Sequence, residues 1–280
     1  MLQWLPELPE VEATRRELLP AMQEARFERV TLHRGDLRTR FPRRFRARLE
    51  GSRVDELTRR AKYLLAHLSS GETLVMHLGM SGSFRVEYDG NAGGPPADAG
   101  RHDHVVFAMS SQATVFFNDP RRFGFMDLVP AGRLDAHPAL SRLGPEPLSA
   151  EFDGAALAAA CRGKKVSLKV ALMDQRVVAG LGNIYVSEAL HLARLSPHRK
   201  ASTIATPTGA PRDAAHRLAA AIKQVLEEAI ERTTGEIYRA SRFRVYDREG
   251  ERCRQRGCQG SIRRRTQAGR STFYCTRCQR

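Results

Sequence analysis

The 280-residue chain has no apolar run that approaches the roughly 18–20 residues of a membrane-spanning helix. Its first residues include acidic side chains and lack the continuous apolar stretch of a secretory signal, so we expect a cytoplasmic protein without a signal peptide. No internal repeat is visible. Charged residues make up 28% and hydrophobic residues 41%, which is typical of a folded chain rather than a disordered one, and the length favours two or three domains.

Negative charge is in short supply. Lys and Arg number 46 against 31 Asp and Glu, which gives a formal net charge of +15. The residues from Ser241 to the end contain twelve arginines, no lysine and three acids, so they carry +9 of that total. Arginine favours bidentate contacts with phosphate. We therefore expect a nucleic acid as partner, with a merely solvated basic tail as the alternative.

Cysteine is scarce before the last 28 residues. Cys161 stands alone at the end of an Ala/Leu-rich segment and is expected to be a buried, inert thiol. The other four form two close pairs, Cys253-x4-Cys258 and Cys275-x2-Cys278. In a cytoplasmic chain this pattern indicates one structural Zn²⁺ bound by four thiolates, and disulfides are the less favoured alternative. The strand-like "STFYC" predicts a zinc-bound β-hairpin.

The pattern of apolar residues divides the chain into regions of different secondary structure. The runs at 73–88 and 104–119, broken by Gly and by Ser-Ser-Gln, each predict hairpin strands. A Pro-punctuated stretch and then a segment with helical periodicity follow them. We expect an N-terminal, mainly β domain over 1–131, a connector over 132–150, a helical domain over 151–240 and a zinc finger over 241–280.

Three short segments are candidate sites. "LPELPEVEATRRELL" (5–19) predicts an amphipathic helix with Glu7 and Glu10 near its N-terminus. "AGLGN" (179–183) places two glycines before a helix start, which favours anion binding by backbone N–H groups, although a simple tight turn is the alternative. "NDPRRFG" (118–124) puts two arginines beside an aromatic ring, as a surface ion-pair site or a wedge inserted into DNA.

Seven motifs together resemble the bacterial formamidopyrimidine-DNA glycosylase/endonuclease VIII family, on its formamidopyrimidine side, over nearly the whole chain. They are "PELPEVE", "RRAKYL", "HLGMSGS", "DPRRFG", "LGPEPL", "GLGNIYVSE" and "GRSTFYCTRCQ", in the family's order. The resemblance implies an α+β multidomain fold: an N-terminal β-sandwich with an N-terminal helix, a helix–two-turn–helix domain and a C-terminal zinc β-hairpin finger, with DNA in the cleft between.

The resemblance also implies an activity. A monomer of this family binds double-stranded DNA with oxidised bases or abasic sites, in the bacterial nucleoid. It excises ring-opened or 8-oxo purines in base excision repair and cleaves the strand by β,δ-elimination. Its nucleophile is the amine of an N-terminal proline, which matches Pro6. Glu7 matches the general acid/base and Glu10 a supporting carboxylate.

The resemblance also implies the remaining site residues, position by position. Lys62 matches a catalytic-site lysine that contacts DNA phosphate near the lesion. Met80, Arg121 and Phe123 match the trio that fills the void left by the flipped-out nucleotide. Arg270 matches a phosphate-binding position and is expected to belong to the catalytic set with Pro6, Glu7 and Lys62. Further positions expected to contact DNA are His77, Lys169 and Asn183. The zinc ligands are Cys253, Cys258, Cys275 and Cys278.

Three features depart from the family pattern. The first cysteine pair is spaced x4 rather than x2. The segment "TTGEIYRASRFRVYD" (233–247) is about nine residues shorter than the family's loop over the flipped base, which predicts weaker recognition of 8-oxoguanine. Residues 1–5 precede Pro6 and would leave its nitrogen a tertiary amide.

We expect translation to start at Leu5, read as methionine and then removed, so that Pro6 becomes the terminus. A lyase-inactive protein that binds damaged DNA is the alternative. A zinc-ribbon module for transcription or RNA binding is a weaker alternative, since it would need neither Glu7 nor the "DPRRFG" wedge.

Overall fold

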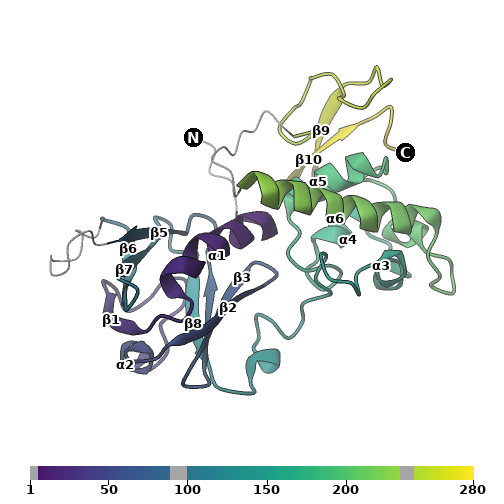
Figure 1. The fold of residues 1–280 in the computed structure, drawn as a ribbon. Coiled ribbons are helices and arrows are strands. Elements are labelled where there is room, and N and C mark those ends of the chain that lie inside the picture. Colours follow the sequence, from purple (N-terminus) through teal and green to yellow (C-terminus); the bar gives the residue numbers. More distant parts are fainter. Residues whose placement is uncertain (1–5, 89–99, 234–242) are drawn as a thin grey trace. The chain divides into compact units, whose positions relative to one another are not determined.

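The computed structural model describes residues 6–88, 100–233 and 243–280 (Figure 1). Contacts within the chain divide it into two compact units, Met1–Ser141 and Arg142–Arg280, and each is described separately here. The finer division at residues 131, 150 and 240 stays a prediction. The shortened segment at 233–247 lies largely outside the described residues, as do residues 1–5.

The first unit contains two antiparallel four-stranded sheets, as expected for a β-sandwich, together with one long and one short α-helix and a 3-10 turn. Helix α1 spans Leu8–Met22, and the short α2 and η1 span Phe45–Leu49 and Leu134–Ala136. One sheet has the order β1-β6-β7-β5, with bounds Phe27–Leu32, Asp103–Met109, Ala113–Asn118 and Ser83–Tyr88. The other has the order β2-β3-β4-β8, with bounds Val54–Arg60, Tyr63–Leu68, Thr73–His77 and Phe125–Val129.

The prediction of a hairpin over residues 73–88 is wrong, whereas the one over 104–119 is confirmed. Strands β6 and β7 do pair as predicted for 104–119, but β4 and β5, which fill 73–88, belong to different sheets. The segment Gly79–Gly82 carries the chain from one sheet to the other. Gly79 has a positive φ of +65°, which glycine adopts without strain. The break that reads as a hairpin turn is therefore a corner between sheets.

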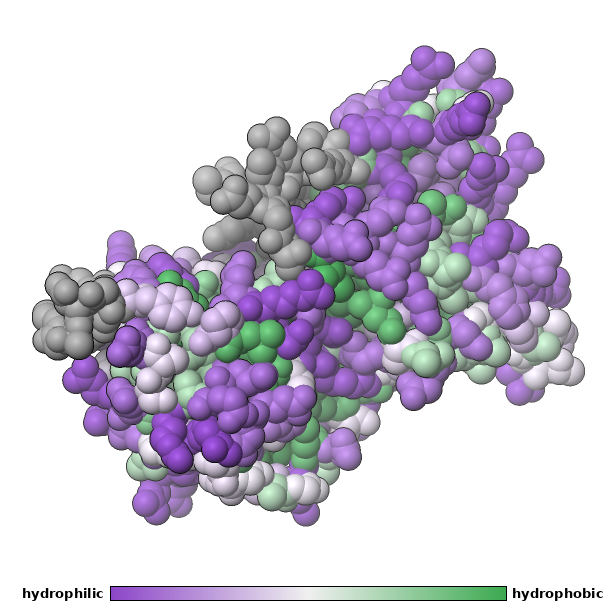
Figure 2. Space-filling view, viewed as in Figure 1, coloured by the Kyte–Doolittle hydropathy of each residue, from purple (hydrophilic) through white to green (hydrophobic). Residues whose placement is uncertain are grey.

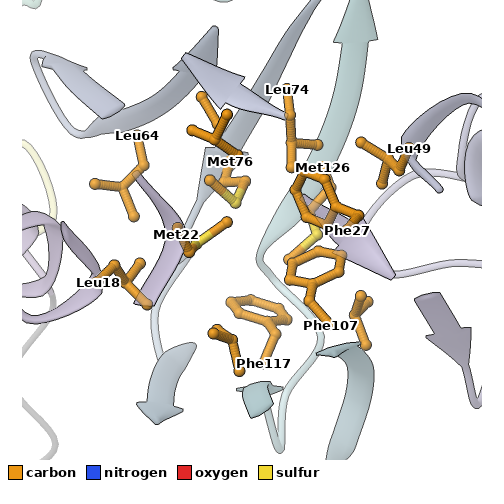
Figure 3. Close-up of a cluster of buried hydrophobic side chains, with 14 of the residues drawn as sticks. Leu18, Met22, Phe27, Leu49, Leu64, Leu74, Met76, Phe107, Phe117 and Met126 are labelled. Atoms are coloured by element: carbon orange, nitrogen blue, oxygen red, sulfur yellow. The ribbon is translucent and has the colours of Figure 1, made fainter. Parts of the chain in front are cut away.

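The core of the first unit lies between the two sheets and α1. Leu18 and Met22 of α1 are fully buried there, and Leu19 is partly buried against the same cluster. Figure 3 shows Leu18 and Met22 pointing toward side chains from both sheets, among them Met76 and Phe117. The apolar face predicted for residues 5–19 is thus the face that anchors α1, because its burial removes large apolar side chains from water.

The second unit combines four α-helices with a two-stranded hairpin among its described residues. The helices are α3 (Gly154–Cys161), α4 (Leu168–Met173), α5 (Asn183–Leu192) and α6 (Asp213–Thr233), with a 3-10 turn η2 (Ala201–Ile204). The hairpin pairs β9 (Ile262–Gln267) with β10 (Arg270–Cys275). Helix α5 contacts α4, α6 and β10. Cys161 is fully buried as expected, and burial raises the pKa of its thiol to about 11, which disfavours the reactive thiolate.

Among the described residues, no helix is both long and apolar enough to cross a membrane.

Candidate functional site

The start of α1 holds two carboxylates next to Pro6. Glu7 precedes the helix with an extended backbone, and only 3% of the residue is exposed. The Glu10 carboxylate accepts the Glu7 backbone N–H at 2.8 Å, and the Glu7 side chain faces the Glu10 backbone N–H in a reciprocal capping box. Pro9 occupies the first turn, where its missing N–H costs nothing. The capping box therefore holds the carboxyl of Glu7, the residue that directly follows Pro6, in a fixed position.

A partly buried ionic network joins α1 to the turn that carries Lys62. The Glu12 carboxylate accepts hydrogen bonds from Arg15 and from Arg59 of β2. The Arg59 guanidinium also donates to the carbonyl of Ala61, at 2.9 Å, in the Ala61-Lys62 turn between β2 and β3. Burial raises the pKa of Glu12, but the arginine contacts outweigh this effect and hold that pKa below its usual value. These contacts thus fix the position of α1 relative to the turn that carries Lys62.

His77 ends strand β4 as a neutral ring. Its Nδ1 accepts the Gly79 N–H at 2.9 Å, and the ring packs against Tyr63 and Phe125 with centroid distances of 4.9 and 5.7 Å. Burial, together with the positive charge of Lys62, lowers the pKa of His77 to about 4. At neutral pH the ring is therefore uncharged, and because Nδ1 is an acceptor the proton lies on Nε2.

The three residues expected to fill a void in DNA come from two adjoining loops. Met80 is 37% exposed and Phe123 43% exposed, and Arg121 is also exposed. The Arg121 guanidinium donates to the Met80 carbonyl at 2.6 Å and lies 5.8 Å from the centre of the Phe123 ring. A Cβ at Gly79 would lie 2.3 Å from the Phe123 carbonyl carbon, so only glycine allows this approach.

A buried carboxylate holds the two loops together. Asp119 is fully buried, and its carboxylate accepts the Ser81 hydroxyl at 2.5 Å and the Gly124 N–H at 2.8 Å. The Ser81 oxygen in turn accepts the Arg121 backbone N–H at 3.3 Å. Ser81 and Asp119 were not among the residues that the sequence motifs assigned, although both lie inside quoted motifs.

In the second unit, Asn183 begins α5 as the "AGLGN" motif predicts. Gly180 has a φ of +82°, and its N–H donates to the Gln175 side chain, which in turn donates to the Leu181 carbonyl. Asn183 is 8% exposed, and its Oδ1 has no hydrogen-bond partner within the described ranges. A buried polar atom without a partner is uncommon in folded proteins, which distinguishes Asn183 from the other residues of this turn.

Lys169 and Arg270 line one pocket of about 270 Å³ in the second unit. Lys169 is 1% exposed, and its ammonium donates to the Ser271 carbonyl at 2.8 Å and to the Thr272 hydroxyl at 2.7 Å. These contacts attach α4 to β10. The resemblance implied a phosphate contact for Lys169. Its hydrogen bonds with β10 indicate a structural role as well, because they hold the hairpin that carries Arg270.

The finger hairpin presents several arginines to solvent. The exposed set consists of Arg263, Arg264, Arg265 and Arg270. Figure 2 shows mostly hydrophilic residues over β9 and β10. This surface matches the arginine-rich tail that the composition singled out.

The four tail cysteines meet at one point. Their sulfur atoms all lie within 4.8 Å of one another, with Cys253 and Cys278 3.7 Å apart and Cys258 and Cys275 also 3.7 Å apart. A tetrahedron of sulfurs about 2.3 Å from a zinc ion has edges of about 3.8 Å. The wider x4 spacing of the first pair is thus compatible with a four-thiolate site, and the cluster fits a metal ion.

Two buried residues of α5 lie outside the sequence assignments. Glu188 accepts backbone N–H groups from Arg244, Val245 and Tyr246, which anchors the start of the finger to the helix. His191 Nε2 lies 3.2 Å from the sulfur of Cys253. Neither contact could be read from the sequence, because each joins residues more than fifty positions apart.

The chain matches two family models that together cover most of it. Residues 5–126 match the formamidopyrimidine-DNA glycosylase N-terminal domain, and residues 143–241 match the formamidopyrimidine-DNA glycosylase H2TH domain. The chain is 56% identical over 294 residues to formamidopyrimidine-DNA glycosylase of Afipia carboxidovorans, with 99% of this chain and 100% of that protein covered.

Solved structures give the same result. The formamidopyrimidine-DNA glycosylase of Thermus thermophilus has a TM-score of 0.80 and 38% identity, over 98% of each chain. The Lactococcus lactis protein in complex with DNA that contains FAPY-dG has a TM-score of 0.85 and 27% identity, over 98% of this chain and 100% of that one.

The fold and the sites are those of a multidomain DNA-repair enzyme built from a β-sandwich, a helical domain and a cysteine-rich hairpin. The chain belongs to the formamidopyrimidine-DNA glycosylase family. It is therefore a DNA glycosylase of base excision repair.

Proposed function

We propose that the protein is a bifunctional DNA glycosylase and abasic-site lyase, with the Pro6 amine as nucleophile. The observation that carries the proposal is the buried Glu7 carboxyl, fixed by the capping box beside Pro6. A secondary amine can form a covalent iminium with a sugar, whereas a tertiary amide cannot. The proposed acting form is accordingly the one that begins at Pro6.

The reaction proceeds by covalent catalysis. The Pro6 lone pair attacks C1′ of the damaged nucleotide, the bond from C1′ to the base breaks, and the base leaves with a proton. Glu7 protonates the ring oxygen as the sugar opens, which yields the iminium. The iminium draws electrons from C1′, so the C2′ proton becomes acidic. Its removal expels the 3′ phosphate by β-elimination, and a δ-elimination then expels the 5′ phosphate.

We propose double-stranded DNA with an oxidised base or an abasic site as the substrate, bound by a monomer on nucleoid DNA in the cytoplasm. Extrusion of a nucleotide costs a few kcal/mol of stacking and pairing. Met80, Arg121 and Phe123 offset part of this cost by filling the gap. Lys62, His77, Lys169, Asn183 and Arg270 supply contacts along the strand, most of them to phosphate.

We further propose that the four-cysteine cluster holds one structural zinc ion. When bound, the ion joins the two knuckles of the hairpin and contributes folding free energy to a segment poor in apolar residues. The ion takes no part in the reaction. Its ligands would be Cys253, Cys258, Cys275 and Cys278, whose separations support this assignment.

The base-release assay tests the proposed activity. Protein that begins at Pro6 is incubated with a duplex that carries one formamidopyrimidine lesion opposite cytosine. We expect release of the ring-opened base and a one-nucleotide gap flanked by phosphates. A duplex that stays intact under conditions where the protein binds it would contradict the proposal.

The same assay tests lesion preference. Because the segment at 233–247 is short, we expect 8-oxoguanine to be excised about tenfold more slowly than the ring-opened purine. This factor corresponds to the free energy of roughly one or two lost hydrogen bonds from the backbone to the base. The control is an abasic-site duplex, whose cleavage needs no base recognition. Equal rates for the two damaged purines would contradict the predicted effect of the short segment.

Ser81→Ala tests the role of the two-loop contact. Loss of the hydroxyl removes the bridge between Asp119 and the Arg121 backbone, so the void-filling residues lose their fixed position. We expect base excision to slow about tenfold, which is the free energy of about one hydrogen bond. Cleavage of a ready-made abasic site should slow less, because no base has to be extruded. Single-turnover rates on the two duplexes measure the difference.

The matched control for this variant is Ser110→Ala. Ser110, in the turn between β6 and β7, accepts the Arg26 N–H at 2.9 Å and has no recorded contact with the two loops among the described residues. Its loss should slow neither reaction. If Ser81→Ala slows both reactions equally, the hydroxyl serves stability alone and the positioning role is wrong.

A further inference from the structure

His191 lies against the cysteine cluster although no metal-binding motif includes it. The residue is in the last turn of α5 and is 2% exposed. Its Nε2 is 3.2 Å from the Cys253 sulfur and 3.8 Å from the Cys278 sulfur. Its Nδ1 has no hydrogen-bond partner in the part of the chain that the structure describes. The sulfur atoms are thus the polar partners recorded for this buried ring.

The distances distinguish a hydrogen-bond donor from a metal ligand. A nitrogen and a sulfur bound to the same tetrahedral zinc ion are about 3.6 Å apart, given bond lengths near 2.1 and 2.3 Å. The 3.2 Å separation from Cys253 is shorter than that, and it suits an N–H···S hydrogen bond. The four sulfurs, all within 4.8 Å of one another, already supply the four ligands that a structural zinc ion takes, so the ring is not needed as a ligand.

We propose that His191 donates a hydrogen bond from Nε2 to the Cys253 thiolate and so ties helix α5 to the metal site. The inference rests on the proposed zinc site. Four thiolates around one Zn²⁺ leave two net negative charges, and a donor to one sulfur disperses part of that charge. Groups that bond to metal ligands in this way raise metal affinity, and their removal costs about 10- to 100-fold.

The helix that His191 ties to the cysteine cluster also carries a candidate DNA-binding residue at its other end. Asn183 is the first residue of α5, eight residues and about 12 Å of helix before His191. Gln279, next to Cys278, donates to the Leu195 carbonyl just beyond the helix and accepts the Cys275 N–H. Loss of the metal would therefore free the C-terminal end of α5 from the cysteine cluster and shift the position of Asn183 at the other end of the helix.

The test compares three variants of the full-length zinc-loaded protein. His191→Phe removes the donor but keeps a ring, and His191→Gln restores an N–H at a similar reach. His198→Phe is the matched control, because His198 packs on Tyr274 and contacts no sulfur in the described contacts. Zinc transfer to excess 4-(2-pyridylazo)resorcinol is followed by absorbance. We expect H191F to lose zinc about tenfold faster, with H191Q and H198F close to the unmodified protein.

A spectroscopic readout separates donation from packing. In the cobalt-substituted protein, loss of the hydrogen bond should move the sulfur-to-cobalt charge-transfer band of H191F to longer wavelength, and H191Q should restore it. If H191F does not fold, histidine ¹H–¹⁵N spectra of the unmodified protein still decide the matter. A proton on Nε2 of His191 is expected, and a proton on Nδ1 instead would overturn the inference.

The outcomes distinguish this inference from the zinc proposal. If the purified protein contains far less than one equivalent of zinc per chain, the proposed zinc site itself is wrong. One equivalent of zinc, with equal release rates and equal cobalt spectra for H191F and the unmodified protein, would refute the role of His191 alone.

Discussion

A protein that begins at Pro6 is expected to become covalently joined to abasic-site DNA when borohydride is present, and the same protein with residues 1–5 retained is expected to give no adduct. Borohydride reduces an iminium to a stable amine, so trapping reports whether the Schiff base forms. In the longer form the Pro6 nitrogen is part of a peptide bond and has no lone pair available for attack. The expected difference is therefore complete rather than partial. Denaturing gel electrophoresis of the two proteins with labelled DNA measures it.

Binding provides the control for this comparison. Residues 1–5 lie outside the groups proposed to contact DNA, so the longer form should still bind an abasic-site duplex in a mobility-shift assay. A form that neither binds nor traps would point to misfolding. Equal trapping by both forms would contradict the assignment of Pro6, because an amine elsewhere in the chain would then be the nucleophile.

Glu7→Gln is expected to slow base excision by about 10²- to 10⁴-fold, the usual range for loss of a general acid. Glutamine keeps an oxygen that can accept the Glu10 N–H of the capping box, so α1 should retain its start. It cannot give a proton to the ring oxygen as the sugar opens. Single-turnover excision of a formamidopyrimidine lesion measures the loss, and thermal unfolding checks that the fold is intact.

Glu17→Gln is the matched control, since Glu17 is an exposed carboxylate on the same helix. It should leave the excision rate within about twofold of the unmodified protein, as expected for a surface position. If Glu7→Gln retained excision within a fewfold of the unmodified rate, another group would be the acid, and the capping box would have only a structural role.

Much of the local structure could be predicted from residue patterns. The apolar spacing of α1 predicts its buried face, which includes Val11 and Leu18. The glycines of "AGLGN" predict the start of α5, and "STFYC" predicts β10. These features depend on neighbours in sequence, such as helical periodicity, backbone freedom of glycine and strand propensity, so a sequence reveals them directly.

The contacts that position the site could not be predicted in this way. Ser81 meets Asp119, and Glu12 meets Arg59, because two sheets and a helix pack in one particular register. The corner at Gly79 shows the same limit, since a glycine break can mean a hairpin or a change of sheet. Lys169 was assigned from the family resemblance, whereas its buried contacts with β10 follow only from the packing of the helical segment on the hairpin.

The measurement that tests the central proposal most directly is the position of the trapped sugar. Protein that begins at Pro6 is reduced on abasic-site DNA, digested with nuclease and trypsin, and examined by mass spectrometry. We predict that the reduced deoxyribose fragment is attached to the N-terminal peptide "PELPEVEATR", on the nitrogen of Pro6. A sugar found instead on a lysine peptide, such as the one that contains Lys62, would contradict the proposed mechanism.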